Sequence, residues 1–233
     1  FDSHSHYNDE KFDNDINTII EETYNDGITR FSCIGFDIAH SIKAINISEK
    51  HSFIYATCGI SPNDINDYNE DNLKKIEEMA HNEKVVAIGE IGLDYYWNKE
   101  NREPQLKAFK KQIEIANKLN LPIVIHTRDA VMDTLQVLKE NNVVNKGVFH
   151  CCPLNRELVK EALKLDFYIS FSGVITFKNA KNAEEIINMV PLEKMLIETD
   201  SPYLAPEPVR GTRNTPINVK LVAAKIAQAR NML

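Results

Sequence analysis

The segment KVVAIGEIGLDYYWNKENREPQLKAFKKQIEIANKLNLPIVIH, residues 84–126, holds two apolar runs separated by an amphipathic stretch. The runs KVVAIGEIG and LPIVIH are apolar at nearly every position, which is typical of strands buried on both faces of a parallel sheet. Between them, Leu106, Phe109, Ile113 and Ala116 recur at helical spacing. The segment therefore predicts a strand, a helix and a second, parallel strand in succession.

The same alternation extends over the whole chain. Helical stripes are found at 12–24, 73–80 and 158–165, and Thr215 followed by Pro216 predicts an N-cap and the first turn of a last helix. Eight strands, each followed by a helix, indicate a TIM (β/α)8 barrel, an α/β fold, as a single domain over residues 1–233. A doubly wound open sheet is the alternative. The predicted strands are residues 1–6, 28–36, 53–60, 84–92, 121–126, 146–150, 166–173 and 194–200.

Composition limits the class of protein. A hydrophobic content of 43% is ample for a core, and a net charge of −7 argues against a broad basic surface for nucleic acid. A phosphate substrate remains compatible with this charge, because bound divalent cations supply positive charge locally. No apolar run reaches the roughly 18 residues of a membrane span. Without a signal-peptide pattern or paired cysteines, we expect a cytoplasmic monomer with reduced thiols and no membrane contact.

Imidazoles and carboxylates stand at the ends of five of the predicted strands. In a TIM barrel the carboxyl ends of all strands meet at one mouth, where the active site lies. His4 and His6 also share one face of their strand, because side chains alternate along an extended chain. The other three histidines fall in helical or connecting segments. The residues that converge on the mouth are His4, His6, Glu90, His126, His150 and Asp200.

This set of donors favours a metal centre. The alternative, six separately hydrogen-bonded polar groups at buried strand ends, would cost desolvation at each of them. Imidazole and carboxylate ligands suit transition metals such as Zn and Mn, and a carboxylate-rich site also admits Mg. Six ligands exceed the three or four protein ligands of one catalytic zinc, so we expect two divalent ions bridged by one carboxylate.

Several motifs together resemble a known family. The runs DSHSH, GEIGLDY, LPIVIHTRDA, FHC and LIETDSPYLAPEPVRGTRNTP are similar, in order and spacing, to the TatD family of metal-dependent deoxyribonucleases within the amidohydrolase-like TIM barrels. The resemblance covers essentially the whole chain. It implies a binuclear phosphodiesterase that removes nucleotides from DNA ends, with the six strand-end residues as metal ligands and Glu90 as the bridge. The chain departs from the family pattern at Asn8, Ser61 and the Cys151–Pro153 loop.

The chemistry of phosphodiester hydrolysis suggests roles for individual residues. Asp200, which can bind a metal with one oxygen and accept the proton of water with the other, is the expected general base. Arg128 is the first candidate for a phosphate contact, because a guanidinium matches phosphate oxygens; an ion pair with Asp129 is its alternative. Arg210 in the last loop is a second candidate. Tyr95 either stacks on a base or sugar of the substrate or packs beneath the site.

Other functions are compatible with the same donors. A D-aminoacyl-tRNA deacylase would cleave an ester within the same family, and an amidohydrolase or lactonase would act on a small substrate. Glu90 stands where many relatives with His-X-His on the first strand carry a modified lysine, which favours the phosphodiester reaction. A barrel that binds metal without catalysis is disfavoured, because all six ligands and the base are present.

Overall fold

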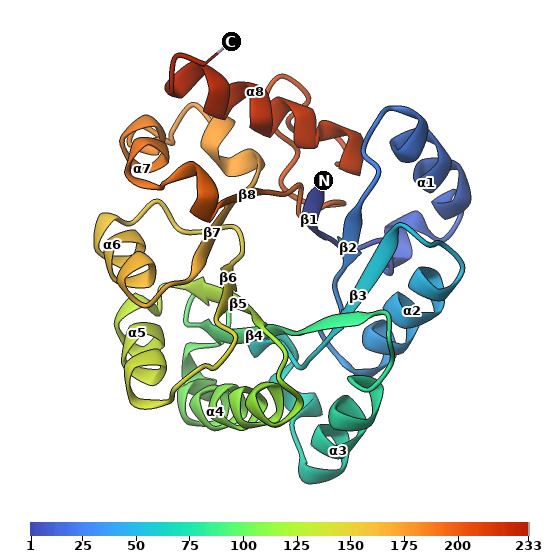
Figure 1. The fold of residues 1–233 in the computed structure, drawn as a ribbon, viewed down its shortest axis with the longest axis vertical. Coiled ribbons are helices and arrows are strands. Elements are labelled where there is room, and N and C mark those ends of the chain that lie inside the picture. Colours follow the sequence, from blue (N-terminus) through green and yellow to red (C-terminus); the bar gives the residue numbers. More distant parts are fainter. Residues whose placement is uncertain (233) are drawn as a thin grey trace.

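The computed structural model describes residues 1–232, within which parallel strands form one ring in chain order (Figure 1). Each strand pairs with the next, as expected for successive strand–helix–strand units. The TIM barrel prediction is therefore confirmed, and the open doubly wound sheet is not formed. The strands are β1 (Asp2–Ser5), β2 (Phe31–Cys33), β3 (Ile54–Cys58), β4 (Val85–Asp94), β5 (Ile123–Arg128), β6 (Gly147–Phe149), β7 (Tyr168–Phe171) and β8 (Met195–Ile197).

The ring closes between the segment after β8 and β1. The amide of Asp200 donates to the carbonyl of His4 at 2.9 Å, and the amide of His6 donates to the carbonyl of Ser201 at 2.7 Å. Inside the ring, the hydroxyl of Ser3 on β1 lies 3.0 Å from that of Ser170 on β7. These bonds place the first and last parts of the chain side by side at the mouth.

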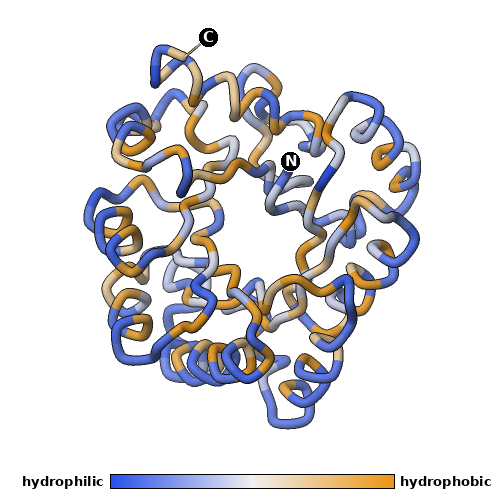
Figure 2. Tube along the Cα trace, in the orientation of Figure 1, coloured by the Kyte–Doolittle hydropathy of each residue, from blue (hydrophilic) through white to orange (hydrophobic). Residues whose placement is uncertain are grey.

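Helices surround the strands on the outside (Figure 1). Hydrophobic residues follow the strands, whereas hydrophilic residues mark the outer turns of the helices (Figure 2). This pattern is expected for helices that bury one apolar stripe against a sheet. The helices are α1 (Ile16–Asn25), α2 (Ile38–Glu49), α3 (Glu70–Met79), α4 (Arg102–Leu119), α5 (Val131–Glu140), α6 (Arg156–Lys164), α7 (Ala183–Met189) and α8 (Val219–Ala229). Among the described residues, no helix is long and apolar enough to cross a membrane.

The start of α8 differs from its prediction. The helix begins at Val219 after a 3-10 turn, Pro216–Asn218, and the side chain of Thr215 makes no capping bond. The buried amide oxygen of Asn214 accepts from the Thr215 amide at 3.0 Å and from the Asn218 side chain at 2.9 Å. Neither bond replaces a cap on the helix amides, and Thr215 and Pro216 open the 3-10 turn instead of the α-helix.

Candidate metal centre

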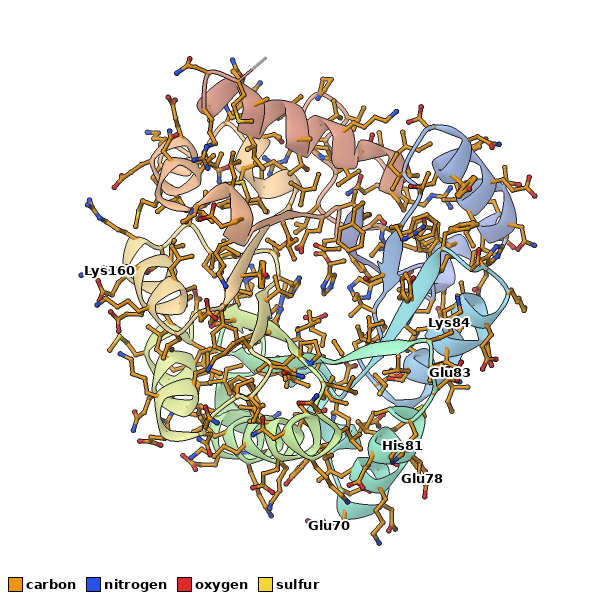
Figure 3. The ribbon with its side chains drawn as sticks, in the orientation of Figure 1. Glu70, Glu78, His81, Glu83, Lys84 and Lys160 are labelled. Carbon is orange, nitrogen blue, oxygen red and sulfur yellow. The ribbon has the colours of Figure 1, made fainter. Side chains whose placement is uncertain are left out.

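The structure brings the six predicted residues together at the carboxyl end of the barrel. His4 lies in β1 and His6 directly after it, Glu90 lies in β4 and His126 in β5. His150 follows β6, and Asp200 follows β8. Of the other three histidines, His81 is labelled in Figure 3 and lies outside the strand ring at the end of α3. The prediction of one shared mouth for the six therefore agrees with the structure.

One oxygen of Glu90 faces the donors from the first and last strands. Its Oε2 lies 3.6 Å from Nε2 of His4 and 3.9 Å from Nε2 of His6. The Asp200 carboxylate closes the group, with Oδ1 at 3.3 Å from Nε2 of His6 and at 3.6 Å from Nε2 of His4. These separations suit donors arranged around one ion at ligand distances of about 2.0–2.2 Å.

The other oxygen of Glu90 faces the two later histidines. Its Oε1 lies 2.9 Å from Nδ1 of His126 and 3.1 Å from Nε2 of His150. The two imidazole nitrogens are themselves 3.1 Å apart. Glu90 therefore stands between two groups of donors, and each of its oxygens serves one of them.

A break in the strand register places Glu90 at this point. The predicted fourth strand spans residues 84–92, but β4 continues to Asp94 and its register with β5 shifts between Ile88 and Ile91. The amide of Glu90 donates to the carbonyl of Gly35 at 2.7 Å instead of continuing the ladder with β5. Bulges of this kind often redirect a side chain beside an active site. Glu90 was expected near the end of the fourth strand, whereas it lies inside β4 at the bulge, which directs its side chain into the mouth.

Gly92 allows β4 to run close to His126. Its φ is +140°, and a Cβ atom built there would lie 2.0 Å from the carbonyl oxygen of His126. Only glycine accepts both this conformation and this approach at low cost. The glycine in GEIGLDY thus serves the packing of β4 against β5 at the site.

The charge balance of the cluster suits a cation. Burial alone would raise the pKa of Glu90, but His150, His126 and His4 outweigh burial and hold that pKa well below its ordinary value. Burial would likewise lower the pKa of His150, but Glu90 and Glu198 raise it well above its ordinary value. In addition, Nε2 of His4 lies 3.2 Å from Nε2 of His6, a contact that one shared proton or one cation stabilises. The donor set therefore fits divalent metal ions.

Three buried carboxylates outside the six predicted residues support these histidines. Asp94 accepts from Nε2 of His126 at 2.9 Å, and Oε1 of Glu198 lies 3.4 Å from Nδ1 of His150. Asp2 accepts from the His4 amide at 3.3 Å, and burial raises the pKa of Asp2 to about 7. Carboxylates commonly hold the second ring nitrogen of a metal-binding histidine. Acids inside otherwise apolar strand runs were the signal that could have identified them.

The predicted substrate contacts lie at or after the carboxyl ends of strands, since Arg128 is the last residue of β5, Tyr95 directly follows β4 and Arg210 lies in the segment after β8. The Arg128 guanidinium stacks 3.8 Å from the ring centroid of Tyr96, and that of Arg210 lies 3.8 Å from the ring centroid of Phe177. Tyr95 donates its hydroxyl to Asp133 at 2.6 Å. Substrate contact by Arg128, Arg210 and Tyr95 stays a prediction. The departures from the family pattern have local roles, since Asn8 donates to the carbonyl of Ile34 at 2.9 Å and Ser61 donates to Asp64 at 2.6 Å.

Comparison with known proteins identifies the family. The model of the family described as TatD related DNase matches residues 1–233. The chain belongs to this family. A Bacillus subtilis member, described as the uncharacterized metal-dependent hydrolase YabD, is 43% identical over 233 residues, which cover all of this chain and 91% of that protein. The Escherichia coli hydrolase YcfH, with the same description, is 44% identical over 183 residues, 78% of this chain and 68% of its own length. The TatD-family chain is accordingly a metal-dependent hydrolase.

Solved structures of TatD homologues share the fold. The Escherichia coli homologue YJJV superposes with a TM-score of 0.93 at 23% identity, covering 98% of this chain and 89% of its own. A TatD family hydrolase from Entamoeba histolytica gives a TM-score of 0.88 at 21% identity, covering 100% of this chain and 91% of its own. At these identities the likeness supports the barrel alone.

Proposed function

We propose that the protein is a deoxyribonuclease that uses two divalent metal ions to hydrolyse phosphodiester bonds at DNA ends as an exonuclease. The observation that carries this proposal is the Glu90 carboxylate, whose two oxygens face different histidines. His4, His6 and Asp200 would hold one ion, and His126 and His150 the other. Mg, Mn and Zn all accept such ligands. When bound, the ions would lower the pKa of a bound water and stabilise charge on the phosphoryl oxygens.

Asp200 is the residue best placed to accept the proton of the attacking water. Its backbone is held at φ 55° by the bond from its amide to the His4 carbonyl, which fixes the carboxylate beside His6. Burial alone would raise the pKa of Asp200, but its contacts with His6 and His4 lower it. The carboxylate is therefore ionised at neutral pH and can act as general base.

The rim of the mouth, formed by strand ends and the segments that follow them, offers cations and aromatic rings for a nucleic-acid strand. Arg128 and Arg210 are exposed there and stack on aromatic rings, and Lys11 lies 4.2 Å from the ring centroid of Tyr203. Basic groups for the backbone combined with aromatic faces for the bases are typical of proteins that bind single strands. Together with the family description, this rim favours DNA over a small amide or lactone as the substrate.

The test is hydrolysis of end-labelled DNA. We expect the purified protein, loaded in turn with Mg, Mn and Zn, to shorten a labelled single strand from one end, and EDTA to abolish the reaction. Single-stranded and double-stranded substrates should be compared at equal concentration of ends. The proposal fails if no metal supports cleavage of either substrate; hydrolysis of a D-aminoacyl-tRNA ester under the same conditions would then assign the deacylase function instead.

A further inference from the structure

Trp97 lies exposed beside the candidate metal centre although it is the largest apolar side chain available for burial. It is the one tryptophan of the sequence, and 65% of it is exposed. Its neighbour Tyr96 is 54% exposed, and the two rings meet edge to face with centroids 4.7 Å apart. Single exposed apolar residues are common on proteins, but two adjacent exposed aromatic rings of this size form a patch that suits a ligand.

The loop that carries the two rings is fixed in place. Oδ1 of Asp94 accepts from the amides of Tyr96 and Trp97, both at 2.9 Å. The buried Gln105 side chain donates to the carbonyls of Asp94 at 3.0 Å and Asn98 at 2.9 Å. A pre-organised surface loses little conformational entropy when a ligand binds. Trp97 is therefore exposed on a loop whose backbone is held by several hydrogen bonds.

Asp94 also connects this loop to the metal centre. While its Oδ1 holds the two loop amides, its Oδ2 lies 2.9 Å from Nε2 of His126. The Asp94 carboxylate thus contacts both the Trp97 backbone amide and the candidate metal ligand His126. On the proposed function, a strand whose end phosphate reached the centre would have its neighbouring nucleotide next to this loop.

Arg128 adds positive charge to the aromatic surface. Its guanidinium carbon lies 3.8 Å from the ring centroid of Tyr96 and 5.5 Å from that of Trp97. The cation occupies the Tyr96 ring, which leaves the indole of Trp97 as the more open of the two rings. A flat ring beside a cation matches the two parts of a nucleotide, a base that stacks and a phosphate that pairs with a guanidinium.

We propose that Trp97, supported by Tyr96 and Arg128, is a stacking subsite for an unpaired nucleobase adjoining the hydrolysed end of the strand. This inference rests on the proposed deoxyribonuclease function, and it adds a determinant of affinity for single strands. Stacking on an aromatic side chain does not select one base, so the subsite should accept all four bases.

Tryptophan fluorescence tests the subsite directly, because Trp97 is the one tryptophan in the sequence. The Mg-loaded Asp200→Asn variant would be titrated with a thymidine 12-mer and with an abasic 12-mer that has the same phosphates. We expect the thymidine strand to quench the emission and the abasic strand to quench it far less. Equal responses would overturn the proposal, because they would show a phosphate contact without stacking.

Affinity measurements provide the second test. By anisotropy of a labelled 12-mer, Trp97→Ala should weaken binding by about 5- to 100-fold and Trp97→Phe should recover most of the loss. The matched control is Tyr168→Ala, which removes a ring that is 38% exposed and lies 4.5 Å from Nζ of Lys194 at the start of β7, the opposite end of the barrel. Unchanged affinity in Trp97→Ala would overturn the proposal.

The experiments distinguish failure of the proposed subsite from failure of the proposed nuclease function. If the wild-type protein degrades labelled DNA while Trp97→Ala binds and degrades it normally, the nuclease function stands and the subsite is wrong. If base-dependent quenching and the loss of affinity are observed while no metal supports DNA cleavage, the subsite stands and the nuclease function is wrong.

Discussion

Asp94 and His126 form a pair in which Oδ2 of the buried carboxylate lies 2.9 Å from Nε2 of the imidazole. The other ring nitrogen, Nδ1, lies 2.9 Å from Glu90. A carboxylate that accepts from Nε2 keeps the proton on that nitrogen and leaves the Nδ1 lone pair free for a metal ion. The pair thus fixes which nitrogen of His126 can act as a ligand.

Asp94→Asn should reverse this preference. The amide oxygen can still accept from the Tyr96 and Trp97 amides, but the amide nitrogen would donate to Nε2 and move the imidazole proton to Nδ1. We expect metal affinity to fall by about 10- to 100-fold with the fold retained. Isothermal titration with Zn or Mn, combined with circular dichroism, measures both quantities.

The control for Asp94→Asn is Asp166→Asn. Asp166 is an exposed carboxylate that pairs with Lys194 just before β7, at the opposite end of the barrel from the candidate metal centre. Its neutralisation should leave metal affinity unchanged. Equal affinity in the wild type and Asp94→Asn would show that Asp94 does not orient His126.

Glu90 provides a test of the number of ions. A glutamine at this position keeps one ligating oxygen but replaces the other with an amide nitrogen, which cannot bind a cation. We expect two ions in the wild type, one in Glu90→Gln and at most one in Glu90→Ala, measured by elemental analysis after dialysis. Two ions in both variants would contradict the bridging role.

The sequence predicted the barrel and the meeting of six polar strand-end side chains at its mouth, because both depend on local signals. Continuous apolar runs identify strands buried on both faces, and a polar residue at the end of such a run is conspicuous. The direction of Glu90 could not be predicted, because it depends on the register of β4 against β5, which pairs residues far apart in the chain. The roles of Asp94 and Glu198 likewise depend on contacts with His126 and His150 on other strands.

Alanine substitutions at Gly92 and Gly211 distinguish the cost of backbone strain from the cost of steric contact. Both have positive φ, +140° and +90°, but a Cβ atom at Gly211 would have no neighbour within 4 Å whereas one at Gly92 would lie 2.0 Å from the His126 carbonyl oxygen. We expect Gly211→Ala to lower the free energy of unfolding by about 1 kcal/mol and Gly92→Ala by about 3 kcal/mol or more. Urea denaturation measures both. Similar losses in the two variants would show that the contact with β5 is relieved at little cost.

Buried thiols should make the protein less stable at alkaline pH. Burial raises the pKa of Cys33 and of Cys58 to about 12, from an ordinary value of 9.0. Since the folded pKa is the higher one, the stabilising contribution is complete below pH 9 and is lost as pH rises from 9 towards 12. At pH 10 the two thiols together should lower the free energy of unfolding by roughly 2–3 kcal/mol relative to pH 8.

Comparison with a variant isolates this effect from other titrating groups. The Cys33→Ala, Cys58→Ala double variant loses packing at every pH, but it should show a smaller decrease between pH 8 and pH 10 than the wild type in urea denaturation. In the native wild type at pH 8, both thiols should also react slowly with a disulfide reagent. The same pH dependence in both proteins would indicate that these two thiols ionise while folded.

The Asp200→Asn variant tests whether Asp200 acts in catalysis or only in binding. Its carboxylate is one of several donors beside His4 and His6, so the remaining donors should still hold metal and substrate in Asp200→Asn. The amide has nearly the same size and keeps one oxygen for a metal, but it cannot accept a proton from water. We therefore expect kcat on DNA ends to fall by about 10²- to 10⁴-fold while KM and the Kd for a single strand change little. Elemental analysis of the variant verifies that metal content is retained. A variant that cleaves DNA at the wild-type rate, with only its affinity weakened, would show that Asp200 binds metal or substrate and that another group accepts the proton.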